Sequence, residues 1–296
     1  MLYGRSMDER LRTPATIRSL RLGETTVTYV PDGACYLTPT GWFPTSTEQE
    51  WAAHSAYLDD AGHVVAGIGS LLVERDGRAL LIDAGFGPYS PQGEGGDAVA
   101  GIHGGALLEN LAQLGRAPRD IEAVAFTHLH IDHIGWAWQP APGDDRLPFA
   151  HAAHLVSEPE WTRRDLLEPH GTSRKMLDAL APAVRTVTDG EEIFPDVRVR
   201  LSTGHTPGHA TYVIGSADRR LIAFGDALHS PAQLNHPDWH AAPDHDTSQS
   251  TDVRRALAAE LQRPDTIGFG VHFADVVFGQ VRADGDGRLA WVPVDE

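Results

Sequence analysis

Residues 127–135 read Thr127-His128-Leu129-His130-Ile131-Asp132-His133-Ile134-Gly135, which places three imidazoles and one carboxylate within six consecutive positions. They follow the apolar run 121–126, which predicts a buried strand, so the cluster begins where a strand ends. Neutral imidazole and carboxylate are preferred ligands of divalent transition metals. A solvated surface loop has no need of histidines at spacings of two and three. The stretch therefore predicts part of a metal site.

Three later strand ends carry the same residue types. The strand predicted at 197–201 leads into Thr203-Gly204-His205-Thr206-Pro207-Gly208-His209. The strand at 220–224 ends at Asp226, and the buried run 267–271 ends at His272. Side chains at strand ends can converge at one edge of a fold, so these positions are candidate partners of the first cluster.

The order of predicted elements indicates an α/β (α+β) protein. Strands and a helix are followed by strands and a helix again, which favours two β-rich halves packed face to face with helices outside, an αββα sandwich. Thr25–Val30 reads as an early strand, and Pro31-Asp32-Gly33 predicts the turn that ends it. We expect residues 1–16 to form a flexible leader and residues 17–296 to form a single domain.

Composition and charge argue against several classes of partner and of metal site. The formal charge of −17 over 296 residues weighs against nucleic acid and anionic membranes, because phosphate binding needs clustered Lys and Arg. Cys35 is the single cysteine, which excludes an intramolecular disulfide and a cysteine-rich zinc site. The first 20 residues lack an apolar signal segment, and no run approaches the roughly 18 apolar residues of a membrane span. These features favour a cytoplasmic protein with a small-molecule substrate. The oligomeric state does not follow from them, and a homodimer is compatible with them.

The complete motif set resembles the metallo-β-lactamase superfamily of hydrolases over residues 20–275. The resemblance rests on His-x-His-x-Asp-His, then Thr-Pro-Gly-His, then Gly-Asp, then Gly-Val-His-Phe, in that order. It implies two divalent metal ions, with Zn2+ favoured. The first ion is expected on His128, His130 and His209, and the second on Asp132, His133 and His272. Asp226 is expected to bridge both. Asp83 matches the residue of the family that orients the ligand-bearing loop.

One residue departs from the pattern of the lactonase branch of this superfamily. Lactonases that open N-acyl homoserine lactones commonly carry Tyr three residues after the bridging Asp, whereas this chain has His229, as in enzymes similar to methyl parathion hydrolase. A histidine there could stabilise a developing oxyanion or protonate the leaving alkoxide. We therefore expect catalytic roles for Asp132, Asp226 and His229. Aromatic residues between Tyr36 and Tyr57 are expected to line the acyl or aryl side of the pocket.

The resemblance implies a dinuclear metal-dependent hydrolase of small esters or lactones, with a hydroxide between the metals as nucleophile. A phosphotriesterase is the first alternative, because of His229. A thioester hydrolase of the glyoxalase type is a second, although no basic C-terminal patch is visible for a glutathione-like carboxylate. A mononuclear iron oxidoreductase similar to persulfide dioxygenases and a non-catalytic metal-binding module are the alternatives from other classes.

Overall fold

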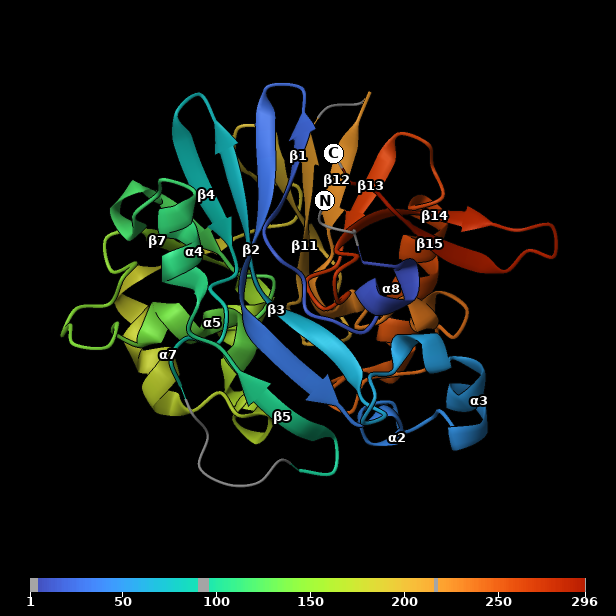
Figure 1. Ribbon diagram of the computed structural model, residues 1–296. Coiled ribbons are helices and arrows are strands. Elements are labelled where there is room, and N and C mark those ends of the chain that lie inside the picture. The colour runs from blue at the N-terminus through green and yellow to red at the C-terminus, as the bar shows by residue number, and fades with distance from the viewer. Residues whose placement is uncertain (1–4, 90–95, 216–217, 296) are drawn as a thin grey trace.

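Two mixed β-sheets lie face to face, and helices cover the outer face of each (Figure 1). The computed structural model describes residues 5–89, 96–215 and 218–295. Within these residues the first sheet has eight strands. Their order is β1 (Arg18–Leu22), β2 (Thr25–Leu37), β3 (Val64–Arg75), β4 (Arg78–Ile82), β6 (Ala123–Ala125), β7 (Ala153–Ser157) and β8 (Val184–Val187), with β5 (Val99–His103) paired to β2.

The second sheet is formed by the C-terminal half of the chain. Its order is β15 (Leu289–Pro293), β14 (Phe278–Ala283), β13 (Thr266–Phe269), β12 (Arg220–Ala223), β11 (Ala210–Gly215), β10 (Val197–Leu201) and β9 (Glu192–Phe194). Neighbouring strands are antiparallel except β12 and β13, while β4, β6, β7 and β8 run parallel in the first sheet. The αββα sandwich predicted from the sequence is confirmed.

The helices are short apart from α8. They are α1 (Met7–Arg10), α2 (Pro39–Trp42), α3 (Glu48–Ala53), α4 (Leu107–Gln113), α5 (Ile131–Trp138), α6 (Glu158–Thr162), α7 (Arg174–Leu180) and α8 (Thr247–Glu260). Single 3-10 turns join them at η1 (Ser55–Tyr57), η2 (Pro118–Asp120), η3 (Arg164–Leu166), η4 (Glu168–His170), η5 (Ala181–Ala183), η6 (Gly225–Ala227) and η7 (Pro231–Leu234). Among the described residues, no helix combines the length and apolarity that crossing a bilayer requires.

Strand periodicity explains the layers. In β3, Leu71 and Val73 enter the core between the sheets, while Leu72 between them faces the outer helices. Helices α4, α5 and α7 cover that outer face of the first sheet. The apolar side of α8, with Leu257 and Ala258, packs on the outer face of the second sheet.

The predicted end of the early strand is wrong. β2 continues through Pro31-Asp32-Gly33 to Leu37, with a register shift between Pro31 and Gly33. The local turn signal is overridden because the buried Asp32 carboxylate has a tertiary role. It accepts hydrogen bonds from four backbone N–H groups and one indole, those of Phe86, Gly87, Gly105, Leu107 and Trp136.

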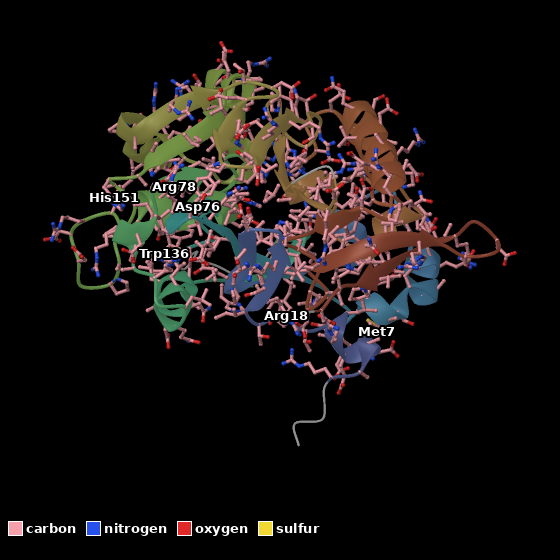
Figure 2. All side chains as sticks on the ribbon, turned by 90° about the horizontal axis from the view of Figure 1, so that it is seen from above. Met7, Arg18, Asp76, Arg78, Trp136 and His151 are labelled. Carbon is pink, nitrogen blue, oxygen red and sulfur yellow. The ribbon has the colours of Figure 1, made fainter. Side chains whose placement is uncertain are left out.

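The segment expected to be a flexible leader carries helix α1, and Ala15 is buried in the core between the sheets. Arg10 and Arg18 both hydrogen-bond to Asp275 near the C-terminus. In the view from above, Met7 and Arg18 lie on the same side of the molecule (Figure 2). Residues 1–4 of the expected leader lie outside the described residues.

Candidate metal centre

The loop after β6 is held by the buried carboxylate of Asp83. Asp83 Oδ1 accepts a hydrogen bond from the Thr127 backbone N–H at 2.8 Å, and Oδ2 accepts one from Thr127 Oγ1 at 2.9 Å. Oδ2 also lies 2.9 Å from Nδ1 of His133, which leaves Nε2 of that ring to face the cluster. Asp83 therefore orients both the loop and one of its imidazoles, as the family resemblance implies.

A second buried carboxylate, Glu160, joins this loop to the loop after β10. It accepts hydrogen bonds from the backbone N–H of Leu129 at 3.0 Å, from Thr206 Oγ1 at 2.7 Å and from the backbone N–H of Gly208 at 3.0 Å. Burial raises the pKa of Glu160, although these hydrogen bonds oppose the shift. Any Cβ at Gly208 would lie 2.0 Å from the Glu160 backbone nitrogen, so only glycine permits this approach.

Asp226, at the start of the segment after β12, separates two groups of imidazoles. Its Oδ2 lies 3.2 Å from Nε2 of His205 and 3.1 Å from Nε2 of His229. Its Oδ1 lies 3.1 Å from Nε2 of His133 and 3.0 Å from Nε2 of His272. Each carboxylate oxygen thus faces its own set of nitrogen atoms. This is the arrangement that a bridging ligand between two cations requires.

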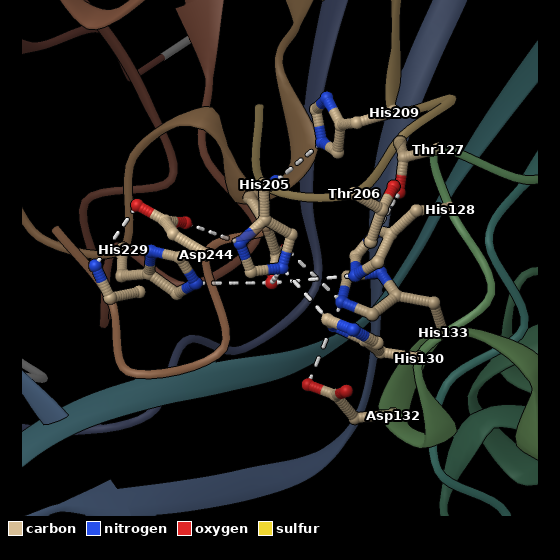
Figure 3. Close-up of polar contacts among 12 residues, drawn as sticks. Thr127, His128, His130, Asp132, His133, His205, Thr206, His209, His229 and Asp244 are labelled. Atoms are coloured by element: carbon tan, nitrogen blue, oxygen red, sulfur yellow. Dashed lines mark hydrogen bonds and ion pairs between the residues drawn. The ribbon is translucent and has the colours of Figure 1, made fainter. Parts of the chain in front are cut away.

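The donor atoms form compact groups in which all members lie within 4.8 Å of one another. One group contains His128, His130, His205 and Asp226, and another contains Asp132, His133 and His272. Figure 3 shows the imidazoles of His128, His130, His133 and His205 converging from the two loops. Asp132 is the most exposed member, at 19% of its side chain, and Asp226 is 4% exposed.

The expectation for His209 is corrected by this geometry. His209 Nδ1 lies 2.8 Å from Ser202 Oγ, and Nε2 accepts a hydrogen bond from the backbone N–H of Asp226 at 3.1 Å. Both nitrogen atoms are therefore occupied, and His209 belongs to none of the donor groups found among the described residues. His205, four residues earlier, takes its place beside Asp226. His209 instead supports the backbone that carries Asp226.

His229 lies where the sequence analysis expected a reactive histidine. Besides its contact with Asp226, its ring is stacked on His272 with centroids 5.4 Å apart and planes 3° apart. The indole of Trp42 meets it edge-on at 5.3 Å, and Phe43 lies 6.4 Å away. Burial lowers the pKa of His229, and Asp226 only partly offsets this, so the ring is neutral near pH 7.

Few residues of the aromatic segment 36–57 reach the cluster. Trp42 and Phe43 contact His229, as described above. Trp51 is a packing residue, because it is 3% exposed, donates its indole N–H to Ser46 Oγ and lies 4.9 Å from Trp239. Tyr36 lies against His103 of β5. The expected aromatic lining of a pocket is therefore reduced to Trp42 and Phe43 on the evidence of ring contacts with His229.

The pKa values of the clustered imidazoles are shifted in both directions, since those of His133, His205 and His272 are raised whereas those of His128 and His130 are lowered. Burial lowers the pKa of His128 and His130 well below the usual range, and neighbouring imidazoles lower it further, so both rings are neutral. Burial disfavours the Asp226 carboxylate, but the surrounding imidazoles hold the pKa of Asp226 well below its usual range. Burial also opposes protonation of His205, yet hydrogen bonds to Asp226 and Asp244 outweigh it and raise the pKa of His205 to about 9.

The unpartnered nitrogen atoms provide a test of whether metal ions fit. The Nε2 atoms of His128 and His130 are buried and have no hydrogen-bond partner among the described residues. An unsatisfied buried polar group costs about 1–3 kcal/mol, so two in one cluster need another function. Imidazoles gathered around an ionised carboxylate fit divalent metal ions.

Comparison with curated proteins gives partial matches. The chain is 31% identical to the anti-Pycsar protein Apyc1 of Paenibacillus harenae over 157 residues, which cover 50% of this chain and 56% of that protein. It is 24% identical to the probable metallo-hydrolase Rv2300c of Mycobacterium tuberculosis (strain ATCC 25618 / H37Rv) over 185 residues, 56% of this chain and 58% of that protein. The alignments thus span about half the length of these relatives.

Solved structures match over nearly the whole chain. AidC, described as a dizinc quorum-quenching lactonase in complex with a product, superposes with a TM-score of 0.80 at 22% identity, covering 95% of this chain and 98% of AidC. The hydrolase AbOPH superposes with a TM-score of 0.77 at 23% identity, with the same coverage. These likenesses establish a common fold. A family profile described as "Metallo-beta-lactamase superfamily" matches residues 67–271. The chain belongs to the metallo-β-lactamase superfamily.

Proposed function

We propose that this protein is a dinuclear metal-dependent hydrolase of small lactones or esters. The observation that supports the proposal most directly is the orientation of the Asp226 carboxylate, whose two oxygen atoms face different sets of imidazoles. His128, His130 and His205 would hold one ion with Oδ2. Asp132, His133 and His272 would hold the other with Oδ1.

Zn2+ is the proposed metal. The donors are imidazole and carboxylate groups, which zinc binds well, although iron and manganese also accept such sets. Cys35 contributes no thiolate, because burial raises the pKa of its thiol. Two divalent ions bound here would lower the pKa of a water molecule and polarise a carbonyl or phosphoryl oxygen.

The protein groups supply orientation and a hydrogen-bond donor. His229 Nε2 lies 3.1 Å from Asp226 Oδ2, which places a neutral imidazole at the edge of the cluster. We assign His229 the role of stabilising the developing oxyanion by a hydrogen bond. Trp42 and Phe43 form an apolar wall beside His229, which favours an acyl or aryl group on that side of the substrate.

A phosphotriester is the second candidate substrate class. The feature that favours it is His229, which replaces Tyr at this position. A histidine can interact with the leaving oxygen of a phosphotriester as well as with that of a lactone. AidC and the AiiA enzymes, whose structures contain N-acyl-homoserine products or ligands, support a lactone as the first choice.

The proposal is tested by assaying one preparation for metal content and for hydrolysis of acyl homoserine lactones, aryl esters, aryl phosphotriesters and glutathione thioesters. We expect about two zinc ions per chain and turnover of the lactone or the ester. Asp226→Asn should reduce kcat/KM at least about 100-fold, and His229→Ala should lower kcat more than it changes KM. His151→Ala, which alters an exposed histidine, is the matched control.

Other outcomes distinguish the alternatives. Hydrolysis of the phosphotriester alone would select the second candidate. Thioester hydrolysis would select the glyoxalase type. One iron per chain with oxygen consumption would select an oxidoreductase. A protein that binds two ions but hydrolyses none of these substrates would contradict the proposal.

A further inference from the structure

A buried charged network lies behind His205. The Asp244 side chain is 0% exposed, and its Oδ1 lies 2.8 Å from Nδ1 of His205. Its Oδ2 accepts hydrogen bonds from Ser250 Oγ at 2.8 Å, from Arg254 Nη1 at 3.1 Å and from the backbone N–H of Ala241 at 3.1 Å. Asp244 thus joins helix α8 to the loop that carries His205.

The Arg254 guanidinium balances the buried carboxylate. Its side chain is also 0% exposed, and its Nε donates to the backbone carbonyl of Pro237 at 2.7 Å. Its Nη1 lies 3.1 Å from Asp244 Oδ2, so the buried carboxylate has a buried cationic partner. A buried ion pair seldom stabilises a fold more than apolar residues of the same volume would. Its position against His205 therefore points to a role at the metal site.

The contact determines which nitrogen of His205 carries the proton. An ionised carboxylate accepts hydrogen bonds only, so His205 must donate from Nδ1. Nε2 would then present its lone pair to a bound metal ion, and it lies 3.2 Å from Asp226 Oδ2 and 3.1 Å from Nδ1 of His130. Backbone bonds keep the segment in place, since the N–H of His245 donates to the carbonyl of His205 at 3.0 Å.

The other donor set has an equivalent contact. Asp83 Oδ2 lies 2.9 Å from Nδ1 of His133, whose Nε2 faces Asp226 Oδ1. One imidazole in each set is thus fixed by a buried carboxylate, from opposite sides of Asp226. His128 and His272 have weaker Nδ1 partners, the hydroxyl of Thr127 and the carbonyl of Gly67.

We propose that Asp244 is the positioning residue of the first metal position and controls the affinity of that position only. The inference rests on the metal centre of the proposed function but not on its substrate. Such carboxylate–histidine pairs raise the basicity of the ligand and fix its tautomer, and their loss costs about 10- to 100-fold in metal affinity.

Asp244→Asn is the test variant, because it keeps the size of the side chain. Ser250, Arg254 and Ala241 present three donors to one side of the carboxylate, so the amide oxygen should turn toward them. The amide nitrogen would then face His205 Nδ1 and place the proton on Nε2, the atom that binds the metal. Asp252→Asn is the control, since Asp252 lies on the same helix with a side chain 76% exposed.

The measurement is stepwise Zn2+ binding to the metal-free full chain, in competition with a chromophoric chelator. Asp244→Asn should weaken one of the two binding steps by about 10- to 100-fold and leave the other step within about twofold of the parent. Asp252→Asn should leave both steps within about twofold of the parent. Equal weakening of both steps by Asp244→Asn, or no weakening, overturns the proposal.

A double-mutant cycle assigns the step to His205. In a His205→Ala background Asp244→Asn should have no further effect on affinity, whereas in a His272→Ala background it should keep its full effect. If Asp244→Asn does not fold, 15N NMR of the zinc-loaded parent decides the question. The His205 resonance, identified by its loss in His205→Ala, should show the proton on Nδ1, and a proton on Nε2 overturns the proposal.

The binding experiment separates this proposal from the proposed function. A protein that binds two zinc ions and hydrolyses nothing still permits every comparison of affinity. A protein that binds no divalent ion at either position refutes both.

Discussion

The Arg10 guanidinium binds the backbone carbonyl oxygen of Asp275 through two nitrogen atoms, Nη2 at 2.7 Å and Nε at 3.0 Å. The backbone N–H of Asp275 in turn donates to the carbonyl of Arg10 at 2.9 Å. Asp275 follows His272 by three residues, and Ala274 between them has a φ of 42°, which is uncommon for a residue other than glycine. The N-terminal segment therefore secures the turn that carries one of the proposed metal ligands.

Arg10→Ala should lower the free energy of unfolding by about 1–3 kcal/mol, because it removes charge-assisted hydrogen bonds to a buried carbonyl. Urea unfolding of the metal-free chain measures the change. Arg12→Ala should change the free energy by less than about 0.5 kcal/mol, since Arg12 makes only a local bond to the carbonyl of Asp8 and a long contact with the exposed Asp60. Equal effects of the two variants would show that the contact with Asp275 adds nothing.

Glu160→Gln should destabilise the protein by about 2–3 kcal/mol and weaken metal binding. Its carboxylate accepts from three donors, and an amide group would direct its own N–H groups at one of them. The measurements are thermal unfolding and zinc affinity. Glu158→Gln, an exposed residue of the same helix α6, should leave both unchanged. A stable Glu160→Gln protein with normal affinity would mean that the two loops do not depend on this bridge.

Stability should fall on acidification partly through His154. This ring is 1% exposed and lies edge-on to Phe126, and burial lowers the pKa of His154 in the folded protein. Below the unfolded value of about 6.5 the unfolded chain binds this proton more readily. The free energy of unfolding therefore decreases as the pH falls from about 6.5 toward the pKa of His154 in the folded protein. For one group the slope is at most about 1.4 kcal/mol per pH unit.

Comparison of variants at about pH 7.5 and about pH 5.5, in chelator, isolates this contribution. His154→Leu should reduce the difference in unfolding free energy between the two pH values. His151→Gln, at an exposed position nearby, should keep the difference of the parent. An unaltered pH dependence in His154→Leu would assign the effect to other groups.

Removal of divalent ions should lower the melting temperature reversibly. Ions that bind only the folded chain stabilise it by about 2.7 kcal/mol when free metal exceeds Kd 100-fold. Differential scanning calorimetry with EDTA and after addition of Zn2+ measures the shift, which Asp226→Asn should largely abolish. Identical melting of the metal-free and zinc-supplied parent would argue against a metal centre in the folded protein.

The layered fold and the location of the site could be predicted from sequence because both depend on local patterns. Alternating apolar residues predict strands such as β3, and clustered ligands after β6 predict where the strands open into a site. The choice between His205 and His209 could not be predicted in this way. Both belong to one short loop, and only the backbone N–H of Asp226, contributed from another strand end, shows which ring is occupied.

Asp244 and Glu160 were not predicted at all. Each is an acidic residue in a polar segment, and nothing in its immediate sequence distinguishes it from exposed neighbours such as Asp238 and Glu158. Their importance arises from partners on other elements, Arg254 and His205 for Asp244, and Thr206 and Gly208 for Glu160. The role of Asp32 also depends on other elements, because its five hydrogen-bond donors come from three separate segments.

The ligands on either side of Asp226 enter the chain at different times during synthesis. The donor group of His128, His130, His205 and Asp226 ends at residue 226, whereas the donor group of Asp132 and His133 also needs His272. Because His272 follows β13, which pairs with both β12 and β14, the second group forms only after the last strands have docked. The second proposed metal position therefore depends on the C-terminal strands, whereas the first depends on residues up to 226.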